Sequence, residues 1–290
     1  MKAYFQKLEP GPERSFLAFR NASPHFNVPW HFHPEYELTY IVQSRGNRLV
    51  GDSIRNFEPG DLALLGPNLP HCWLNLQEDI EKKGHQAEAV VIQFRNDFMG
   101  PKFFQKPELK IVREILEKSA NGLSFYGETR QHIGKVMLDF PKKKPIEQFI
   151  GLIKVLRTLA KSKEYISLSS DGFTAQLAQT ESKKINQVLN YLKENFKNKI
   201  KLDEVAALTH MTPAAFCRFF KARTSKTFVQ FVNEFKIGYA SRLLIETDLP
   251  VSQIASESGF HNIANFNRHF SRLKETTPMR YRKQVREVGY

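Results

Sequence analysis

The chain has 290 residues, 41% of them hydrophobic and 25% charged, which is typical of a globular protein of about two domains. Two distant cysteines exclude a disulfide scaffold or zinc ribbon, and the lack of any run of about 20 apolar residues or a signal-peptide core indicates a cytoplasmic protein without membrane contact. The net charge of +13 is uneven: residues 1–100 have 10 basic and 12 acidic side chains, residues 101–180 have 14 and 8, and residues 181–290 have 19 and 10, so the last part favours a polyanionic partner.

The first hundred residues are predicted to form short strands separated by turns. Apolar and polar side chains alternate from Leu38, and Gly, Pro, Asn and Asp mark the turns, beginning with Ser44–Arg48. Val90–Ile92 is a continuous apolar run, which indicates a strand buried on both faces. The expected strands are 38–43, 49–50, 54–57, 62–65 and 89–94. Their number and spacing predict a small barrel or sandwich.

Residues 101–180 are predicted to be a helical segment followed by a linker. Helices are expected over 107–119, over 128–140 and from Pro145. The third carries a wide apolar stripe of Phe149, Leu152, Ile153, Leu156 and Leu159. Such a stripe favours a dimer seam, with packing against the barrel as the alternative. Residues 162–180 have the composition of a linker.

The last 110 residues are predicted to be entirely helical and to contain an internal repeat. Helices are expected over 181–196, 202–209, 213–223, 228–246, 251–258 and 263–274. The segment from Val205-Ala206 to Phe220 recurs as Ile254-Ala255 to Phe270. Each copy has a short helix, a tight turn and a second helix, which is the helix–turn–helix arrangement. Gly259 suits the second turn, whereas His210 occupies the equivalent place in the first.

The second helix of each copy is predicted to read DNA. If its Phe residues are buried, the opposite face of the helix presents small side chains with an Arg or Asn at each turn. Such a face suits a helix that lies in the major groove of DNA. The alternative for any one of these residues is that it simply faces solvent. The connecting helix over 228–246 would be roughly 28 Å long, which allows two reading helices about one DNA turn apart. The predicted DNA-binding residues are Thr212, Ala214, Ala215, Cys217, Arg218, Lys221, Asn262, Ile263, Ala264, Asn267, Arg268 and Arg272.

Residues 181–283 resemble the DNA-binding domain of the AraC/XylS family of bacterial transcription regulators. The matching segments are Leu202–Ala206, Met211-Thr212 with Phe216–Lys221, Lys236-Ile237, Ala240, Leu243-Leu244, Ile254-Ala255, Gly259-Phe260, Asn265–Phe270 and Thr277–Arg282. The resemblance implies two helix–turn–helix units, over about 202–223 and 251–274, that read successive major grooves. It also implies promoter activation through RNA polymerase.

A second resemblance lies in the N-terminal part. His31, His33 and Glu37 fit the spacing His-x-His-x3-Glu, and His71 follows a Pro-Gly-Asp turn, as in the two motifs of the cupin barrel. On one strand these alternate side chains share a face. The resemblance implies a divalent metal held by these four residues; the alternative is that the motif only shapes the barrel or lines an effector pocket. Imidazole and carboxylate suit Fe, Mn, Ni, Cu or Zn. The predicted effector-binding residues are Trp30, His31, His33, Glu37, Tyr40, His71 and Trp73.

We therefore expect a multidomain fold: a cupin-like jelly-roll β-barrel sensor over 1–100, a helical dimerisation segment and linker over 101–180, and an all-α double helix–turn–helix domain over 181–290. The expected function is that of a sequence-specific transcription regulator, an activator, which binds double-stranded DNA as a homodimer and responds to a sugar or related metabolite. No cofactor is required beyond the metal that the barrel could hold, and no catalytic residue is expected. The alternative is a metal-dependent cupin oxygenase or isomerase with an accessory DNA-binding domain.

Overall fold

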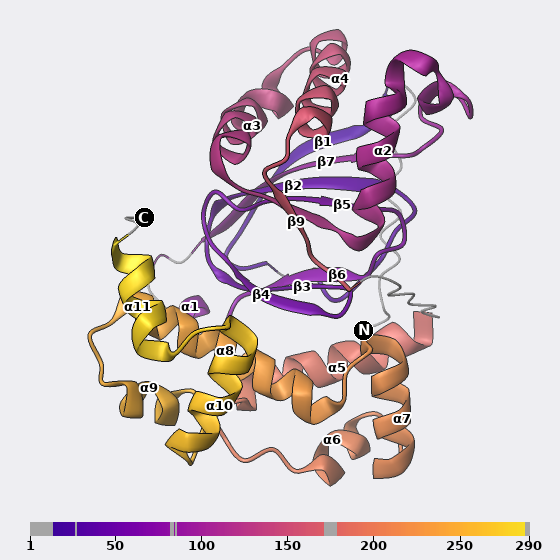
Figure 1. Cartoon of the computed structure of the whole chain (residues 1–290). Helices are drawn as coiled ribbons and strands as arrows, with labels where there is room; N and C mark the ends of the chain where they lie inside the picture. Colours follow the sequence, from indigo (N-terminus) through magenta and orange to yellow (C-terminus); the bar gives the residue numbers. More distant parts are fainter. Residues whose placement is uncertain (1–13, 27, 82–83, 85, 171–178, 288–290) are drawn as a thin grey trace. The chain divides into compact units, whose positions relative to one another are not determined.

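The computed structural model describes residues 14–26, 28–81, 84, 86–170 and 179–287. The chain divides into two compact units: residues 2–53 and 57–175 form the first, and residues 176–290 are grouped with residues 54–56 in the second. The first unit combines sheet and helix, and the second is built from helices (Figure 1). A sheet-rich N-terminal part followed by a helical C-terminal part is thus confirmed. No helix in the described part of the chain is both long and apolar enough to cross a bilayer.

Two sheets form the framework of the first unit. The larger has six antiparallel strands in the order β1 (Leu17–Ser23), β7 (Ala87–Phe94), β2 (Tyr36–Gln43), β5 (Leu62–Leu65), β8 (Leu123–Phe125) and β9 (Tyr165–Ser167). The smaller has the order β4 (Ser53–Phe57), β3 (Gly46–Val50) and β6 (His71–Leu74). Among the described residues, strand pairing does not join the two sheets into a closed barrel, so the jelly-roll barrel is not confirmed.

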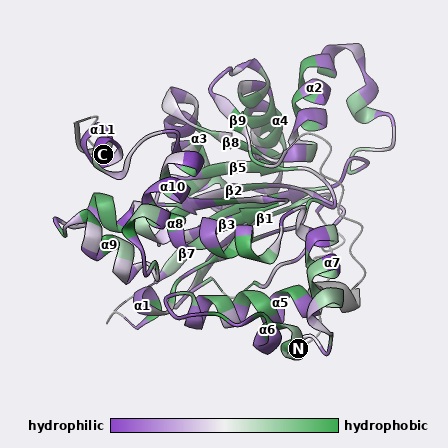
Figure 2. Cartoon of the chain, turned by 60° about the horizontal axis from the view of Figure 1, so that its bottom comes forward, coloured by the Kyte–Doolittle hydropathy of each residue, from purple (hydrophilic) through white to green (hydrophobic). Residues whose placement is uncertain are grey.

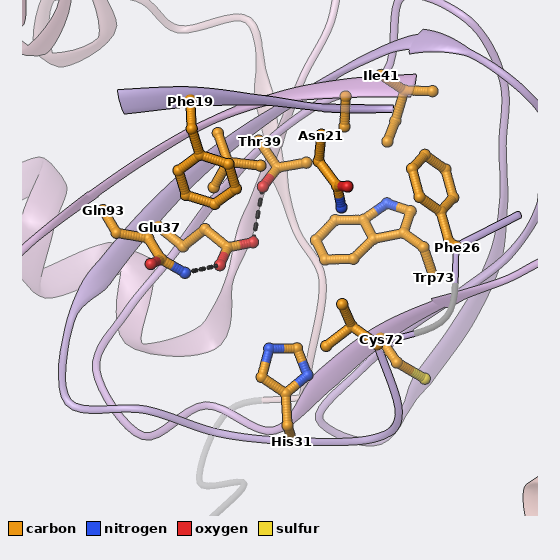
Figure 3. Close-up of a pocket in the computed structure, with 13 residues that line it drawn as sticks. Phe19, Asn21, Phe26, His31, Glu37, Thr39, Ile41, Cys72, Trp73 and Gln93 are labelled. Carbon is orange, nitrogen blue, oxygen red and sulfur yellow. Dashed lines mark hydrogen bonds between the residues drawn. The ribbon is translucent and has the colours of Figure 1, made fainter. Parts of the chain in front are cut away.

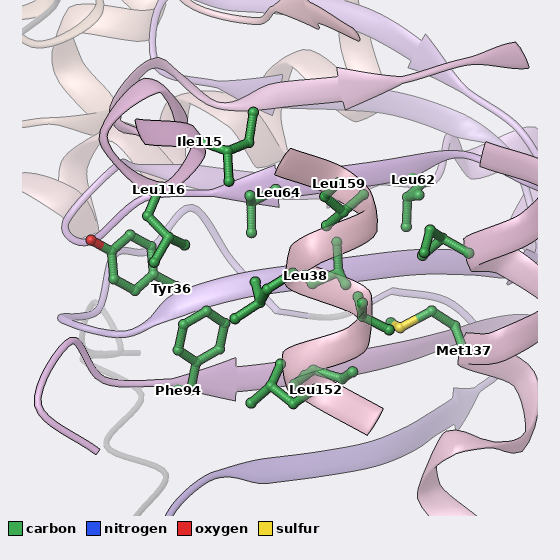
Figure 4. Packing of buried hydrophobic residues seen from close by; sticks show 14 of the residues in the cluster. Tyr36, Leu38, Leu62, Leu64, Phe94, Ile115, Leu116, Met137, Leu152 and Leu159 are labelled. Atoms are coloured by element: carbon green, nitrogen blue, oxygen red, sulfur yellow. The ribbon is translucent and has the colours of Figure 1, made fainter. Parts of the chain in front are cut away.

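The inner strands of the larger sheet are buried on both faces. Helices α2 (Lys110–Lys118), α3 (Gly127–Asp139) and α4 (Pro145–Lys161) cover one face, where Leu38, Val90 and Ile92 belong to their core (Figure 4). Val91 points the other way, into a second core that includes residues of the smaller sheet. The prediction that the Val90–Ile92 run is buried on both faces is confirmed. All four residues of β5 are also buried, and this strand is hydrophobic in Figure 2.

The apolar stripe of α4 is largely used within the chain itself. Leu152, Leu156 and Leu159 are fully buried in the core beneath the three helices, and Phe149 packs against that core. For these residues the alternative interpretation, packing within the chain, is right. On the outer side of α4, Ile146 and Ile150 remain 62% and 47% exposed. The homodimer itself stays a prediction.

The sequence-based boundary at residue 100 falls inside the first unit. Residues after 100 provide β8 and β9 of the larger sheet as well as the three covering helices, and they share one core with the first hundred residues. The expected linker over 162–180 contains β9, while residues 171–178 lie outside the described residues. A short helix, α1 (Gln77–Ile80), follows the smaller sheet.

The second unit contains seven helices in its described part: α5 (Gln179–Asn195), α6 (Leu202–Leu208), α7 (Pro213–Thr224), α8 (Phe228–Glu246), α9 (Val251–Glu257), α10 (Ile263–Lys274) and α11 (Pro278–Glu287). The bounds of α8 and α10 agree with the prediction, and α11 was not predicted. Thr227 begins α8 with a capping box, because its hydroxyl accepts from Gln230 N and the Gln230 side chain accepts from Thr227 N. Helix α8 is buried along most of its length, including Phe231 and Phe235, so it is the central element of this unit.

Candidate functional site

The two helix–turn–helix segments have the same turn geometry. Met211 N donates to Ala206 O at 3.0 Å in the first, and Phe260 N donates to Ala255 O at 2.9 Å in the second. The residue that turns the chain is left-handed in both, with φ of 55° at His210 and 77° at Gly259. His210 therefore adopts the conformation that glycine adopts more easily, and the first turn forms as predicted.

Helices α7 and α10 begin with side-chain caps at two of the predicted DNA-binding positions. The Thr212 hydroxyl accepts from Ala215 N at 3.3 Å. The Asn262 carboxamide oxygen accepts from Ala264 N at 2.8 Å and from Asn265 N at 3.1 Å. Both side chains thus fix the first turn of a helix.

The predicted DNA-reading faces are open to solvent. Phe216 and Phe220 of α7 and Phe266 and Phe270 of α10 are fully buried, which turns the opposite sides outward. Ala215 is half-buried, and the other predicted residues on the two helices are exposed: Ala214, Cys217, Arg218, Lys221, Ile263, Ala264, Asn267, Arg268 and Arg272. Ile263 is 43% exposed, although isoleucine is usually found inside proteins.

Two arginines on α10 are held by neighbours one turn away. Arg268 Nη2 donates to Asn265 Oδ1 at 2.8 Å, and Arg272 Nη2 lies 3.3 Å from His269 Nδ1. Burial, followed by the charges of Arg272 and Arg268, lowers the pKa of His269, which keeps it neutral as a partner. These contacts orient the guanidinium groups at the surface.

The repeat extends beyond the helix pairs. A left-handed residue ends α7 at Ser225 and α10 at Glu275, with φ of 56° and 55°. Two positions later, Thr227 and Thr277 cap the next helices, α8 and α11. The predicted repeat, which ends at Phe270, therefore continues as far as the caps of α8 and α11.

The turn at Gly259 is packed closely against the segment that follows α5 and is hydrogen-bonded by a residue of α8. A Cβ added to Gly259 would lie 2.7 Å from the carbonyl oxygen of Lys197, just beyond α5. From α8, Lys236 Nζ donates to Gly259 O at 2.7 Å, and burial lowers the pKa of this amine. The turn therefore depends on the absence of a side chain at Gly259 and on a buried amine at Lys236.

In the first unit, the four residues of the predicted metal site meet. His31, His33, Glu37 and His71 are all buried, and each offers a ligand atom within 4.8 Å of the others. Glu37 lies on β2 and His71 on β6, and a backbone bridge links His31 to His71. The predicted set is brought together between the two sheets.

Backbone carbonyls orient all three imidazoles. His31 Nδ1 lies 2.8 Å from Pro29 O, His71 Nδ1 2.8 Å from Leu69 O, and His33 Nδ1 3.2 Å from Glu35 O. A proton on each Nδ1 leaves each Nε2 as a lone pair. The Nε2 atoms of His33 and His71 lie 3.0 and 3.7 Å from Glu37 Oε2. The Nε2 lone pairs and the negatively charged carboxylate oxygen repel each other unless a proton or a metal cation lies between them.

The protonation of these groups follows from their burial and mutual contacts. Burial, with the neighbouring His71, lowers the pKa of His31 to about 3, so this imidazole is neutral at physiological pH. Burial alone would raise the pKa of Glu37, but the charges and hydrogen bonds of His71 and His33 outweigh it and hold this pKa well below its ordinary value. For His33, the hydrogen bond and charge of Glu37 outweigh burial and raise the pKa.

Two further residues hold the Glu37 carboxylate. Thr39 Oγ1 donates to Glu37 Oε1 and Gln93 Nε2 donates to Glu37 Oε2, each at 2.7 Å. Gln93 is opposite Glu37 in the pairing of β7 with β2. Sequence analysis missed both. Alternation from Glu37 would have found Thr39, but only the strand pairing identifies Gln93.

A cavity of about 60 Å³ adjoins the cluster (Figure 3). His31, Glu37 and Trp73 of the predicted effector residues line it. Tyr40 does not: it lies on the opposite face of β2, where its ring contacts the helical residue Gly134. Trp30 is buried outside the cavity lining. The lining residues that sequence analysis missed are Phe19, Asn21, Phe26, Val28, Thr39, Ile41, Cys72, Ala89, Val91 and Gln93.

Residues 205–284 match the family model described as helix-turn-helix domain. Over 263 residues the chain is 23% identical to the uncharacterized HTH-type transcriptional regulator YdeC of Bacillus subtilis, covering 88% of this chain and 86% of that protein. It is 22% identical to the uncharacterized HTH-type transcriptional regulator YfiF of the same organism, covering 99% and 89%. Among solved structures, ToxT from Vibrio cholerae O395 is 12% identical, with a TM-score of 0.36, and the match covers 92% of this chain and 97% of that one.

Proposed function

We propose that this chain is a DNA-binding transcription regulator of the AraC type and that it changes its affinity for DNA when its N-terminal unit binds a small molecule. The helix-turn-helix match and the relatives named as transcription regulators support the regulator. They also support a protein that is not an enzyme, so the oxygenase or isomerase alternative is set aside.

One observation carries the DNA-binding part of the proposal: the second helix of each repeat buries its Phe face and exposes small and basic side chains. Arg218 on α7 and Arg268 on α10 are exposed at corresponding places. Arg can bind a guanine edge with two hydrogen bonds, and Ala or Ile can contact a thymine methyl group. We propose that the twelve predicted residues of α7 and α10 and their caps form the DNA-reading surface.

Selection of bound sequences from a random DNA pool tests sequence-specific binding. The full chain should enrich a site with two half-sites about one helical turn apart, since two reading helices enter successive major grooves. Enrichment of no common sequence would contradict a regulator that reads bases. The selected site then allows DNA affinity to be measured with and without metal and effector; equal affinity in every state would contradict effector control.

We propose that the sensor unit is cupin-like and that His31, His33, Glu37 and His71 hold a divalent transition metal. Three imidazoles and a carboxylate are a donor set for such ions. A histidine that binds a metal through one ring nitrogen usually donates the N–H of the other to a carbonyl oxygen, as the Nδ1 atoms do here. When bound, the metal would accept the converging lone pairs and would act as a Lewis acid toward a small-molecule ligand. Thr39 and Gln93 would hold Glu37 in place for it.

Metal content of the purified chain tests this site. We expect about one equivalent of a divalent transition metal after reconstitution and its loss in His33→Ala. His132→Ala is the matched control, since His132 is exposed on α3. Equal metal content in both variants would contradict the assignment.

We further propose that the regulator acts as a cytoplasmic homodimer, activates promoters through RNA polymerase, and responds to a sugar or a related metabolite. The exposed isoleucines of α4, Ile146 and Ile150, are consistent with a second copy covering this helix. The aromatic side chains of the cavity support a small organic effector. Light scattering of the pure chain and transcription from the selected site with purified polymerase test the first two points.

A further inference from the structure

The cavity beside the four-residue cluster has a composition that restricts its ligand. Its walls are mostly apolar, with Phe19, Phe26, Ile41 and Val91 among them, while His31 and Glu37 of the cluster form part of the same lining. A ligand in this cavity would therefore reach the metal proposed above with one end and contact hydrocarbon with the other. The inference rests on that proposed metal.

The size of the cavity limits the ligand to a few atoms. One water-sized position takes about 10–15 Å³ of such space, so about 60 Å³ corresponds to roughly four to six positions. A compound of three or four carbon atoms with its oxygens fits this space, and a hexose is larger.

The charge of the lining favours a ligand with one negative charge. Among the residues that line the cavity, Glu37 is the only carboxylate, there is no lysine or arginine, and an imidazole such as that of His31 binds a metal in its neutral form. A divalent metal with one carboxylate leaves a buried charge of +1. A monoanion cancels it, whereas a neutral sugar leaves a buried charge unbalanced.

A polar group in the wall lacks a partner. Trp73 is 8% exposed and lines the cavity, and its indole Nε1 has no hydrogen-bond partner among the described residues. A buried N–H donor of this kind is rare and indicates an acceptor supplied by a ligand or water. In addition, four protein donors leave two places on a six-coordinate metal, which two neighbouring oxygens of one ligand can fill.

We propose that the effector is a small monocarboxylic acid with a second oxygen on the adjacent carbon, that is, a 2-oxo or 2-hydroxy acid of three or four carbon atoms. One carboxylate oxygen and the oxygen on the adjacent carbon would bind the metal, the other carboxylate oxygen would accept from Trp73 Nε1, and the alkyl end would lie against the apolar wall. Within the broad class of sugar-related metabolites, this selects a short acid over a neutral sugar.

A titration of the full chain loaded with Co²⁺ tests the proposal, because the visible absorption of Co²⁺ changes when its ligands change. The probes are pyruvate, propanoate (which lacks the second oxygen), hydroxyacetone (which lacks the charge) and D-xylose. We expect pyruvate to change the spectrum and to bind at least ten-fold more tightly than the other three. Propanoate, hydroxyacetone or D-xylose binding as tightly as pyruvate would overturn the proposal, as would a spectrum that none of the probes changes.

Two variants locate the site. Trp73→Phe keeps an aromatic side chain but replaces the indole and removes its N–H, so the affinity for pyruvate should fall about three- to ten-fold while Co²⁺ affinity is retained. Ala89→Leu fills the cavity from β7 and should abolish pyruvate binding, whereas Ala22→Leu, at an exposed position of β1, should not. Unchanged pyruvate affinity in Ala89→Leu would overturn the proposed position.

The same experiment distinguishes failure of the proposed ligand from failure of the proposed metal site and of the proposed regulator function. Co²⁺ binding without a response to pyruvate overturns the ligand and leaves the metal and the regulator in place. A chain that binds no Co²⁺ overturns both the metal and the ligand. DNA binding to the selected site, measured on the same preparation, tests the regulator independently of either.

Discussion

The two cysteines differ in their surroundings, and this allows the surface of α7 to be mapped. Cys217 is exposed among the proposed DNA-reading residues, whereas Cys72 is fully buried and burial raises the pKa of its thiol. Iodoacetamide should therefore modify Cys217 in the native chain and Cys72 only after unfolding, because the thiolate is the reactive form. The selected DNA site should slow the modification of Cys217 at least ten-fold, as measured by mass spectrometry. An equal rate with bound DNA would place α7 outside the interface.

Arg268 is expected to read a base. Its guanidinium is exposed and is held by Asn265 Oδ1 at 2.8 Å. Arg268→Ala should cost about 1–3 kcal/mol of binding free energy on the selected site and relax the preference at one base pair. Arg113→Ala, on α2 of the first unit, is the matched control. If binding to all sequences weakened equally, Arg268 would instead be a phosphate contact.

At the scale of elements, the two turns of the repeat are expected to respond differently to substitution. Gly259→Ala puts a methyl group at positive φ and 2.7 Å from Lys197 O, so it should destabilise the second unit by about 1–3 kcal/mol. His210→Gly, at the equivalent place, should change stability by less than about 1 kcal/mol, since glycine accepts the same φ. Urea unfolding followed by circular dichroism measures both. Equal effects would show that the contact with Lys197 is unimportant.

The helices of the second unit could be predicted from the sequence because their signals are local. The bounds of α8 follow from Thr227, which caps it, and those of α10 from Asn262. Helix α11 was missed because its ten residues are mostly polar; among its described side chains, Tyr281 packs its ring against Phe270. Its amphipathic signal is therefore weak.

The strands were harder to predict because pairing, rather than local sequence, defines them. The three residues of β8 are a strand only because β5 and β9 lie on either side, and β6 has four buried residues without alternation. For the site, the spacing from His31 to Glu37 identified two histidines and a carboxylate, and a turn pattern added His71 as the third histidine. The placement of Tyr40 was wrong because side chains alternate along β2, which puts Tyr40 opposite Glu37 and Thr39.

At the scale of the whole molecule, the last described segment of the first unit, which ends at Ser170, is hydrogen-bonded to the smaller sheet, the sheet that carries His71 and Trp73. Asp52, in the turn after β3, accepts from Ser170 N at 2.9 Å and from Ser170 Oγ at 2.5 Å. Strand β3 pairs with β6, and Leu168 is buried in the same core as Trp73. We therefore expect ligand binding in the cavity to shift β6 and β3, and with them the position of Ser170, from which the chain continues to the second unit.

Asp52→Ala should weaken this coupling and leave the individual binding steps intact. We expect unchanged Co²⁺ binding and unchanged DNA affinity of the metal-free chain, but at least a three-fold smaller change of DNA affinity on loading the sensor. Asp97→Ala, which removes an exposed carboxylate after β7, is the control. A full response in Asp52→Ala would show that coupling takes another route.

The position of Trp73 has a practical consequence. Its ring lies 5.7 Å from the ring of His71, and the only other tryptophan of the chain, Trp30, is in the same unit. Tryptophan fluorescence, excited at a wavelength where tyrosine does not absorb, therefore originates entirely from the first unit, and a paramagnetic ion held by His71 would quench the emission of Trp73 at contact range. The DNA-binding unit contains no tryptophan, so light emitted by the intact regulator on its operator would report the occupancy of the sensor without any attached label.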